Sequence, residues 1–149
     1  MIRITKRLEF DAGHRIPDHR SVCRNLHGHR YVMELSLEGE VKNIPGASDH
    51  GMLLDFSEVK AMAKEHLVDQ WDHAFLVYEG DEEVVKLLAA LPDHKTVMLN
   101  RVPTAEHLAR IAFETLAPLI DNRYGNQLRL AKIRLYETPN SWAEYGAKD

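Results

Sequence analysis

The chain has 149 residues, of which 44% are hydrophobic and 28% are charged, and its formal net charge is −4. This composition excludes a disordered chain, and the length suits a single domain, residues 1–149, around one core. The acidic balance excludes a protein that binds nucleic-acid backbones without sequence preference, because such binding needs a basic surface.

Two amphipathic strands are predicted in the first part of the chain. Residues 2–12 alternate apolar and polar side chains, and residues 29–41 do so again, which is the period of a strand with one buried face. Residues 15–26 show no period and contain Pro17, so we expect a loop that returns the second strand antiparallel to the first.

The middle of the chain is predicted to be helical. Asp55 and Glu58 have the spacing of a capping box, so a helix is expected over about 56–69. A short helix is expected over 81–91, and a longer one begins after Thr104, which stands where an N-cap residue belongs.

The last part of the chain returns to strand. Residues 131–137 alternate, and a hairpin turn over 138–141 leads into a short strand over 142–145. The expected order ββααββ indicates an α+β fold, with an antiparallel four-stranded sheet and two main helices on one face. The other face and both sheet edges would then be open, so we expect subunits to assemble into a ring.

The start of the chain and its apolar runs decide the expected compartment. The N-terminal residues lack the apolar core of a signal peptide, and no apolar run approaches a membrane span. We therefore expect a cytoplasmic protein with no membrane and no nucleic-acid partner.

His14, His27 and His29 are candidate metal ligands. His27 and His29 are two residues apart, so in a strand both side chains leave the same face, and His14 can lie across on the neighbouring strand. A catalytic zinc site commonly has three protein ligands and an open fourth position, so we predict Zn²⁺ here rather than scattered polar histidines. Parity places all three on the face of Phe10 and Tyr31, towards the helices, unless a bulge intervenes.

Cys23 is the only cysteine, which excludes an internal disulfide. It could be a fourth zinc ligand, which would close the coordination shell, or a thiol that acts as a base or nucleophile beside the cation. The residues alone favour neither of these two roles over the other.

Three acidic positions are candidates of a weaker kind. Asp72 beside His73 offers an acid–base pair, although adjacent side chains usually point apart. Glu106 and Glu137 need no functional role to be explained: Glu106 fits an acidic residue in the first turn of a helix, and Glu137 fits the exposed end of a strand. A buried carboxylate can nevertheless accept two parallel N–H bonds from an amino-pyrimidinone ring.

Together these residues resemble the 6-pyruvoyl-tetrahydropterin synthase / 6-carboxy-tetrahydropterin synthase family. The matching segments are Phe10-Asp-Ala-Gly-His14, Cys23-x3-His27-Gly-His29, Gly51-Met-Leu-Leu-Asp55-Phe56, Asp72-His73, Pro103-Thr-Ala-Glu106 and Tyr136-Glu137-Thr138. The three-residue gap after Cys23 is similar to the bacterial queuosine-route branch.

The resemblance implies a T-fold (tunnel fold), in which trimeric rings stack into homohexamers with active sites between subunits. It also implies roles for the candidate residues: zinc on His14, His27 and His29; catalysis by Cys23 and by Asp72 and His73 from a neighbouring subunit; and substrate binding by Glu137, Thr104 and Glu106.

The implied reaction converts 7,8-dihydroneopterin triphosphate to 6-carboxy-5,6,7,8-tetrahydropterin, releasing acetaldehyde and triphosphate, for queuosine biosynthesis. One alternative is a 6-pyruvoyl-tetrahydropterin synthase, and another is a non-catalytic pterin-binding or structural zinc protein of the same fold. Trp71 and His107 depart from the family pattern, and the segment between Phe75 and Pro103 is longer than in compact bacterial members. These departures leave the product open.

Overall fold

Two long strands form the centre of the computed structural model, which describes residues 1–148; Asp149, the last residue of the expected domain, lies outside the described residues. β1 (Ile2–His14) pairs antiparallel with β2 (His27–Gly39) along its whole length. Both predicted strands are confirmed, and both extend to the histidines at the loop between them. That loop contains one short helical turn, η1 (Val22–Arg24).

The C-terminal hairpin completes the antiparallel part of the sheet. β5 (Leu128–Thr138) pairs with β2, and β6 (Ser141–Gly146) pairs with β5. The prediction of two strands joined by a tight turn is confirmed, although β5 begins three residues earlier than the alternation indicated.

The sheet has six strands and is mixed, so the predicted four-stranded antiparallel sheet with the order ββααββ is wrong. β3 (Ala74–Tyr78) pairs parallel with β1, and β4 (Thr96–Leu99) pairs parallel with β3, which gives the order β4-β3-β1-β2-β5-β6. The sequence Ala-Phe-Leu-Val-Tyr of β3 is a short continuous apolar run. Such a run has no alternation, and its period alone cannot distinguish a buried strand from a helix.

The first helical segment runs without a break from Phe56 to Trp71, as α1 (Phe56–Ala63), the π-helical turn η2 (Lys64–Val68) and α2 (Asp69–Trp71). The Asp55 carboxylate caps it by accepting the Ser57 N–H at 2.8 Å. The predicted helix over 56–69 is confirmed.

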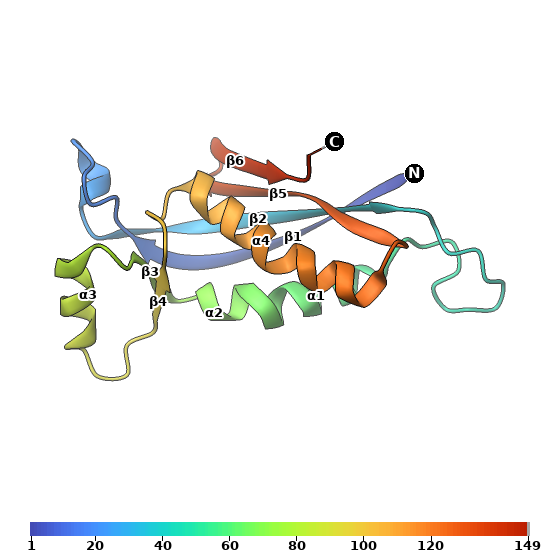
Figure 1. Cartoon of the computed structure of the whole chain (residues 1–149), viewed down its shortest axis with the longest axis horizontal. Helices are drawn as coiled ribbons and strands as arrows, with labels where there is room; N and C mark the ends of the chain where they lie inside the picture. Colours follow the sequence, from blue (N-terminus) through green and yellow to red (C-terminus); the bar gives the residue numbers. More distant parts are fainter. Residues whose placement is uncertain (149) are drawn as a thin grey trace.

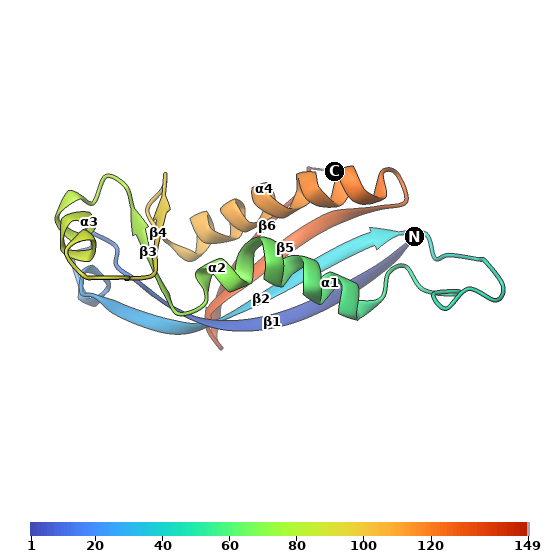
Figure 2. The ribbon, with the colours of Figure 1, turned by 90° about the horizontal axis from the view of Figure 1, so that it is seen from below.

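The longest helix is α4 (Ala105–Tyr124), and Thr104 caps it by accepting the His107 N–H through its hydroxyl oxygen. α3 (Glu82–Ala89) is the short helix expected between β3 and β4. Figures 1 and 2 show α1, α2 and α4 lying along the same face of the sheet, while α3 stands with β3 and β4 at one end of the molecule.

The core fills the space between the sheet and this helical layer. Its largest fully buried side chains are Tyr31, Phe10, Met33, Leu35, Leu37, Leu53, Leu76, Leu108, Leu116, Ile120, Leu130 and Ile133. Burying one such side chain stabilises the fold by roughly 2 kcal/mol. The inward side chains of β1 and β2 therefore hold both strands against the helical layer.

The outer edge of β1 is open over most of its length. Within residues 1–148, β3 pairs with β1 only at Ala12 and Gly13, so no strand covers the edge over residues 2–11. An unpaired edge of this length is a template for pairing with another chain. Among the helices of the described residues, none is both long and apolar enough to span a membrane.

Candidate functional site

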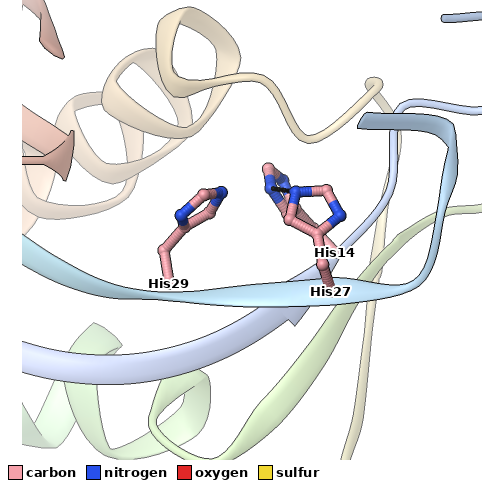
Figure 3. Close-up of side chains that lie close together, drawn as sticks. All are labelled: His14, His27 and His29. Atoms are coloured by element: carbon pink, nitrogen blue, oxygen red, sulfur yellow. Dashed lines mark hydrogen bonds between the residues drawn. The ribbon is translucent and has the colours of Figure 1, made fainter. Parts of the chain in front are cut away.

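The three predicted metal ligands converge at the loop end of β1 and β2 (Figure 3). His14 lies opposite His27 in the strand register, and His29, opposite Ala12, lies two positions further along on the same face. One ring nitrogen of each histidine lies within 4.8 Å of the others. The pairing of β1 with β2 has no bulge, so the rings share a face with Phe10 and Tyr31 and point towards the helical layer. The side indicated by parity is confirmed.

Backbone carbonyls set the orientation of two of the rings. His14 Nδ1 lies 2.8 Å from the Pro103 oxygen, and His27 Nδ1 lies 2.7 Å from the Asn25 oxygen. A carbonyl can only accept, so each Nδ1 carries a proton, and in the neutral ring Nε2 then carries the lone pair. The two Nε2 atoms lie 3.1 Å apart and face each other as two acceptors.

His29 completes the group with a third available nitrogen. Its Nε2 is buried without a hydrogen-bond partner among the described residues, 3.4 Å from Glu137 Oε1. Burial lowers the pKa of His14 and of His29, because desolvation penalises the charged imidazolium. Neutral imidazoles with converging lone pairs are the form that binds Zn²⁺, so these residues fit the predicted metal.

Gly28 allows the two strands to carry this group. A Cβ at this position would lie 2.9 Å from the backbone oxygen of Ala12. Glycine therefore permits the close approach of β1 and β2 that brings His14 opposite His27.

Cys23 lies in a cavity that the three histidines do not line. It is half-buried in η1 and lines a cavity of about 260 Å³ together with Ile16, His19, Thr104, Ala105, Glu106, Glu137, Ser141 and Trp142. The structure thus brings Cys23 together with all three predicted substrate-binding residues. The compact group of potential ligand atoms contains the three histidines and not Cys23, which favours the thiol as a reactant over the thiol as a ligand.

Glu137 connects this cavity to the histidines, because it lines the cavity and also approaches His29. The backbone that supports the cavity comes from distant segments: the N-terminus of α4, η1 and the β5–β6 turn. No single stretch of sequence predicts this arrangement.

Asp72 and His73 form a close pair, with His73 Nδ1 3.0 Å from Asp72 Oδ1. The Asp11 N–H also donates to this carboxylate and is the main reason why the pKa of Asp72 is lowered. His73 has a φ of 60°, a left-handed conformation that costs a residue with a Cβ about 1 kcal/mol or more. The backbone thereby turns the imidazole back onto the neighbouring carboxylate.

His73 lines a different cavity from Cys23. His73 lies at a cavity of about 500 Å³ that also involves Asp11, Gly13, His29, Arg30 and His94. One chain therefore links the Cys23 cavity to His29 through Glu137, whereas His73 lines a separate cavity that His29 also borders.

The residues that depart from the family pattern have structural roles. Trp71 is 3% exposed and packs edge-on against Phe10 with ring centroids 6.1 Å apart, so it fills the core. His107 Nδ1 donates to the Val102 oxygen at 2.7 Å, which holds the segment before α4. The adjacent Pro103 carbonyl is the acceptor for His14.

Sequence reasoning missed the groups that orient the site. The carbonyls of Asn25 and Pro103 fix two tautomers, but a backbone oxygen leaves no trace in a sequence. The clearest available signal was Pro103 directly before the Thr104 cap, because proline and cap together define where the chain enters α4.

The chain is similar to known proteins over nearly its whole length. The family model described as 6-pyruvoyl tetrahydropterin synthase matches residues 3–148. A Rickettsia bellii protein named 6-carboxy-5,6,7,8-tetrahydropterin synthase is 34% identical over 145 residues, covering 97% of this chain and 99% of that protein. A Haemophilus influenzae protein of the same name is 34% identical over 148 residues, with the same two coverages.

A solved structure of Caenorhabditis elegans 6-pyruvoyl tetrahydropterin synthase superposes with a TM-score of 0.64 at 25% identity, covering 99% of this chain and 96% of that one. The resemblance inferred from the motifs is confirmed, and the bacterial relatives carry the name of the branch that the Cys23-to-His27 spacing favoured. The chain belongs to the 6-pyruvoyl tetrahydropterin synthase family.

Proposed function

We propose that the chain is a zinc-dependent 6-carboxy-5,6,7,8-tetrahydropterin synthase, a lyase that converts 7,8-dihydroneopterin triphosphate with release of acetaldehyde and triphosphate, in queuosine biosynthesis. The observation that carries the proposal is the convergence of three imidazole nitrogens beside a cavity that contains Cys23 and Glu137. The names of the bacterial relatives support the carboxy-forming reaction.

His14, His27 and His29 would hold the Zn²⁺. When bound, it would supply Lewis acidity towards the hydroxyl oxygens of the substrate side chain. The carbonyls of Pro103 and Asn25 keep Nδ1 protonated in His14 and His27, so their Nε2 lone pairs stay directed into the site.

Cys23 takes a proton from the substrate side chain as its thiolate. Its place in the cavity, outside the group of three histidines, supports this role. His73, held by the Asp72 carboxylate at Nδ1, moves a second proton through Nε2.

Glu137 anchors the pterin ring by accepting two of its N–H groups. Thr104 and Glu106, from the first turn of α4, line the same cavity on another side. The approach of Glu137 to His29 would place the anchored ring next to the metal.

The complete site forms between subunits of a homohexamer built from two trimers. Two observations support this assembly: the open edge of β1 and the separation of the His73 cavity from the Cys23 cavity within one chain. A cytoplasmic, single-domain protein remains our expectation from the sequence.

The nearest alternative is a 6-pyruvoyl-tetrahydropterin synthase, which the name of the C. elegans structure favours. Product analysis after incubation with 7,8-dihydroneopterin triphosphate separates the two. Acetaldehyde with 6-carboxytetrahydropterin supports our proposal, and a pyruvoyl product without acetaldehyde overturns it. Pterin binding without any turnover would identify the non-catalytic alternative.

A further inference from the structure

Lys95 holds the chain on both sides of His73. Its Nζ donates to the carbonyl oxygens of Asp69 at 2.6 Å and Asp72 at 2.5 Å. Its own carbonyl accepts the Phe75 N–H at 3.1 Å. Lys95 immediately precedes β4, within the long segment between Phe75 and Pro103 for which the sequence suggested no role.

The Lys95 ammonium group lies at the C-terminal end of the first helical segment. α2 ends at Trp71, and the last carbonyls of a helix have no intrahelical donors and carry partial negative charge. A lysine that donates to these oxygens satisfies them and complements the helix dipole. The contact therefore fixes the direction in which the chain leaves the helix.

That direction determines where the imidazole of His73 points. Asp72 is extended, with ψ of 128°, and His73 then adopts its left-handed conformation. From the side of β1, the Asp11 N–H donates to Asp72 Oδ1 at 3.0 Å, and the Asp11 oxygen accepts the His73 N–H at 2.6 Å. Lys95 holds the two residues that flank this turn, Asp72 through its carbonyl oxygen and Phe75 through its N–H.

We propose that Lys95 is a positioning residue for the Asp72–His73 pair. Its ammonium holds the Asp72 carbonyl so that His73 Nδ1 stays on the Asp72 carboxylate and Nε2 stays free for proton transfer. The inference rests on the proposed function, in which His73 moves a proton. Lys95 acts through Asp72 and not on the substrate.

Three variants test the role. Lys95→Met removes the N–H donors and keeps most of the side-chain length. Lys95→Arg keeps N–H donors and should retain the parent orientation of His73. Lys86→Met is the matched control, because Lys86 is an exposed lysine of α3 in the same segment. Zinc content and thermal midpoint establish that each variant is folded and loaded.

Nitrogen-15 NMR of His73 measures positioning directly. At about pH 8.5, above the range in which imidazoles ordinarily titrate, the parent protein should show the tautomer protonated at Nδ1. Lys95→Met should shift His73 towards the tautomer protonated at Nε2, whereas Lys95→Arg and Lys86→Met should not. In turnover, Lys95→Met should lower kcat about tenfold without changing KM, because it misplaces a proton-transfer group and leaves substrate binding intact.

The outcomes separate this inference from the proposed function. A parent-like tautomer and kcat in Lys95→Met would overturn the positioning role, even if its thermal midpoint falls, because Lys95 would then serve only helix stability. Undiminished turnover in His73→Ala would instead overturn the proposed role of the pair. In that case, the His73 tautomer measured in the parent protein and in Lys95→Met would still show whether Lys95 orients the His73 ring.

Discussion

The Nε2 atoms of His14 and His27 lie 3.1 Å apart, and the proton of each ring is directed away to a backbone carbonyl. Two lone pairs at this separation repel unless a cation lies between or beside them. With both rings neutral, the folded chain holds an electrostatic cost at this point, which a bound Zn²⁺ would offset.

Metal removal should destabilise the protein for that reason. We expect a chelator to lower the thermal midpoint and added Zn²⁺ to restore it, with about 2.7 kcal/mol of stabilisation at a free zinc concentration of 100 Kd.

His27→Ala should abolish stoichiometric zinc in metal analysis of the purified protein. His66→Ala is the matched control, since His66 is exposed on the first helical segment. A parent protein that holds no zinc when purified without chelator would contradict the metal assignment.

Cys23→Ala should separate metal binding from catalysis. Because Cys23 lies outside the group of three histidines, the variant should keep its zinc. Its kcat should fall by roughly 10² to 10⁴, the range that a positioned proton-transfer group contributes. Zinc loss in the variant would indicate a ligand role, and unchanged turnover would exclude the thiol from the reaction.

Mixing two inactive variants should restore activity if sites form between subunits. Cys23→Ala and His73→Ala alter residues that line separate cavities of one chain. After denaturation and co-refolding at equal concentrations, about one quarter of the interfaces should combine an intact Cys23 with an intact His73, as random assembly of a closed oligomer requires. Each variant refolded alone is the control. A mixture as inactive as its components would place the whole site within one chain.

Glu38 should make stability depend on pH in the acid range. It is 7% exposed on the outer face of β2, where Arg3 and Arg129 both donate to its carboxylate. These bonds, that of Arg3 first, lower the pKa of Glu38 in the folded state. The stabilisation is therefore complete above the unfolded pKa of about 4.3 and is lost as the pH falls through the lower folded pKa.

Glu38→Gln should consequently lower the free energy of unfolding by roughly 1 kcal/mol at pH 7, a modest figure because both arginines are about half exposed. The difference from the parent protein should shrink below about pH 4. Urea denaturation at the two pH values measures it, with Glu79→Gln at an exposed position as the control. An equal loss at both pH values would mean that the carboxylate charge is not responsible.

The sequence by itself determined the two central strands, both main helices with their caps at Asp55 and Thr104, and the set of three histidines. These features follow from local rules. β1 and β2 show the two-residue period of a half-buried strand, and Asp55 and Thr104 each accept a backbone N–H from the first turn of their own helix. His27 and His29 are spaced so that both side chains leave the same strand face. The motif spacing also identified the family, because the matching residues occur in one order along the chain.

Only the tertiary structure decided the rest. β3 and β4 are too short to show a period, and their parallel pairing depends on contacts between distant segments, of β3 with β1 and of β4 with β3. Only folding brings the carbonyl oxygens of Pro103 and Asn25 to Nδ1 of His14 and His27. Folding also brings Lys95 to the Asp72 carbonyl oxygen, 23 residues away in the sequence. Backbone groups and distant contacts have no signature in composition or spacing, so the orientation of the site residues is a property of the folded chain.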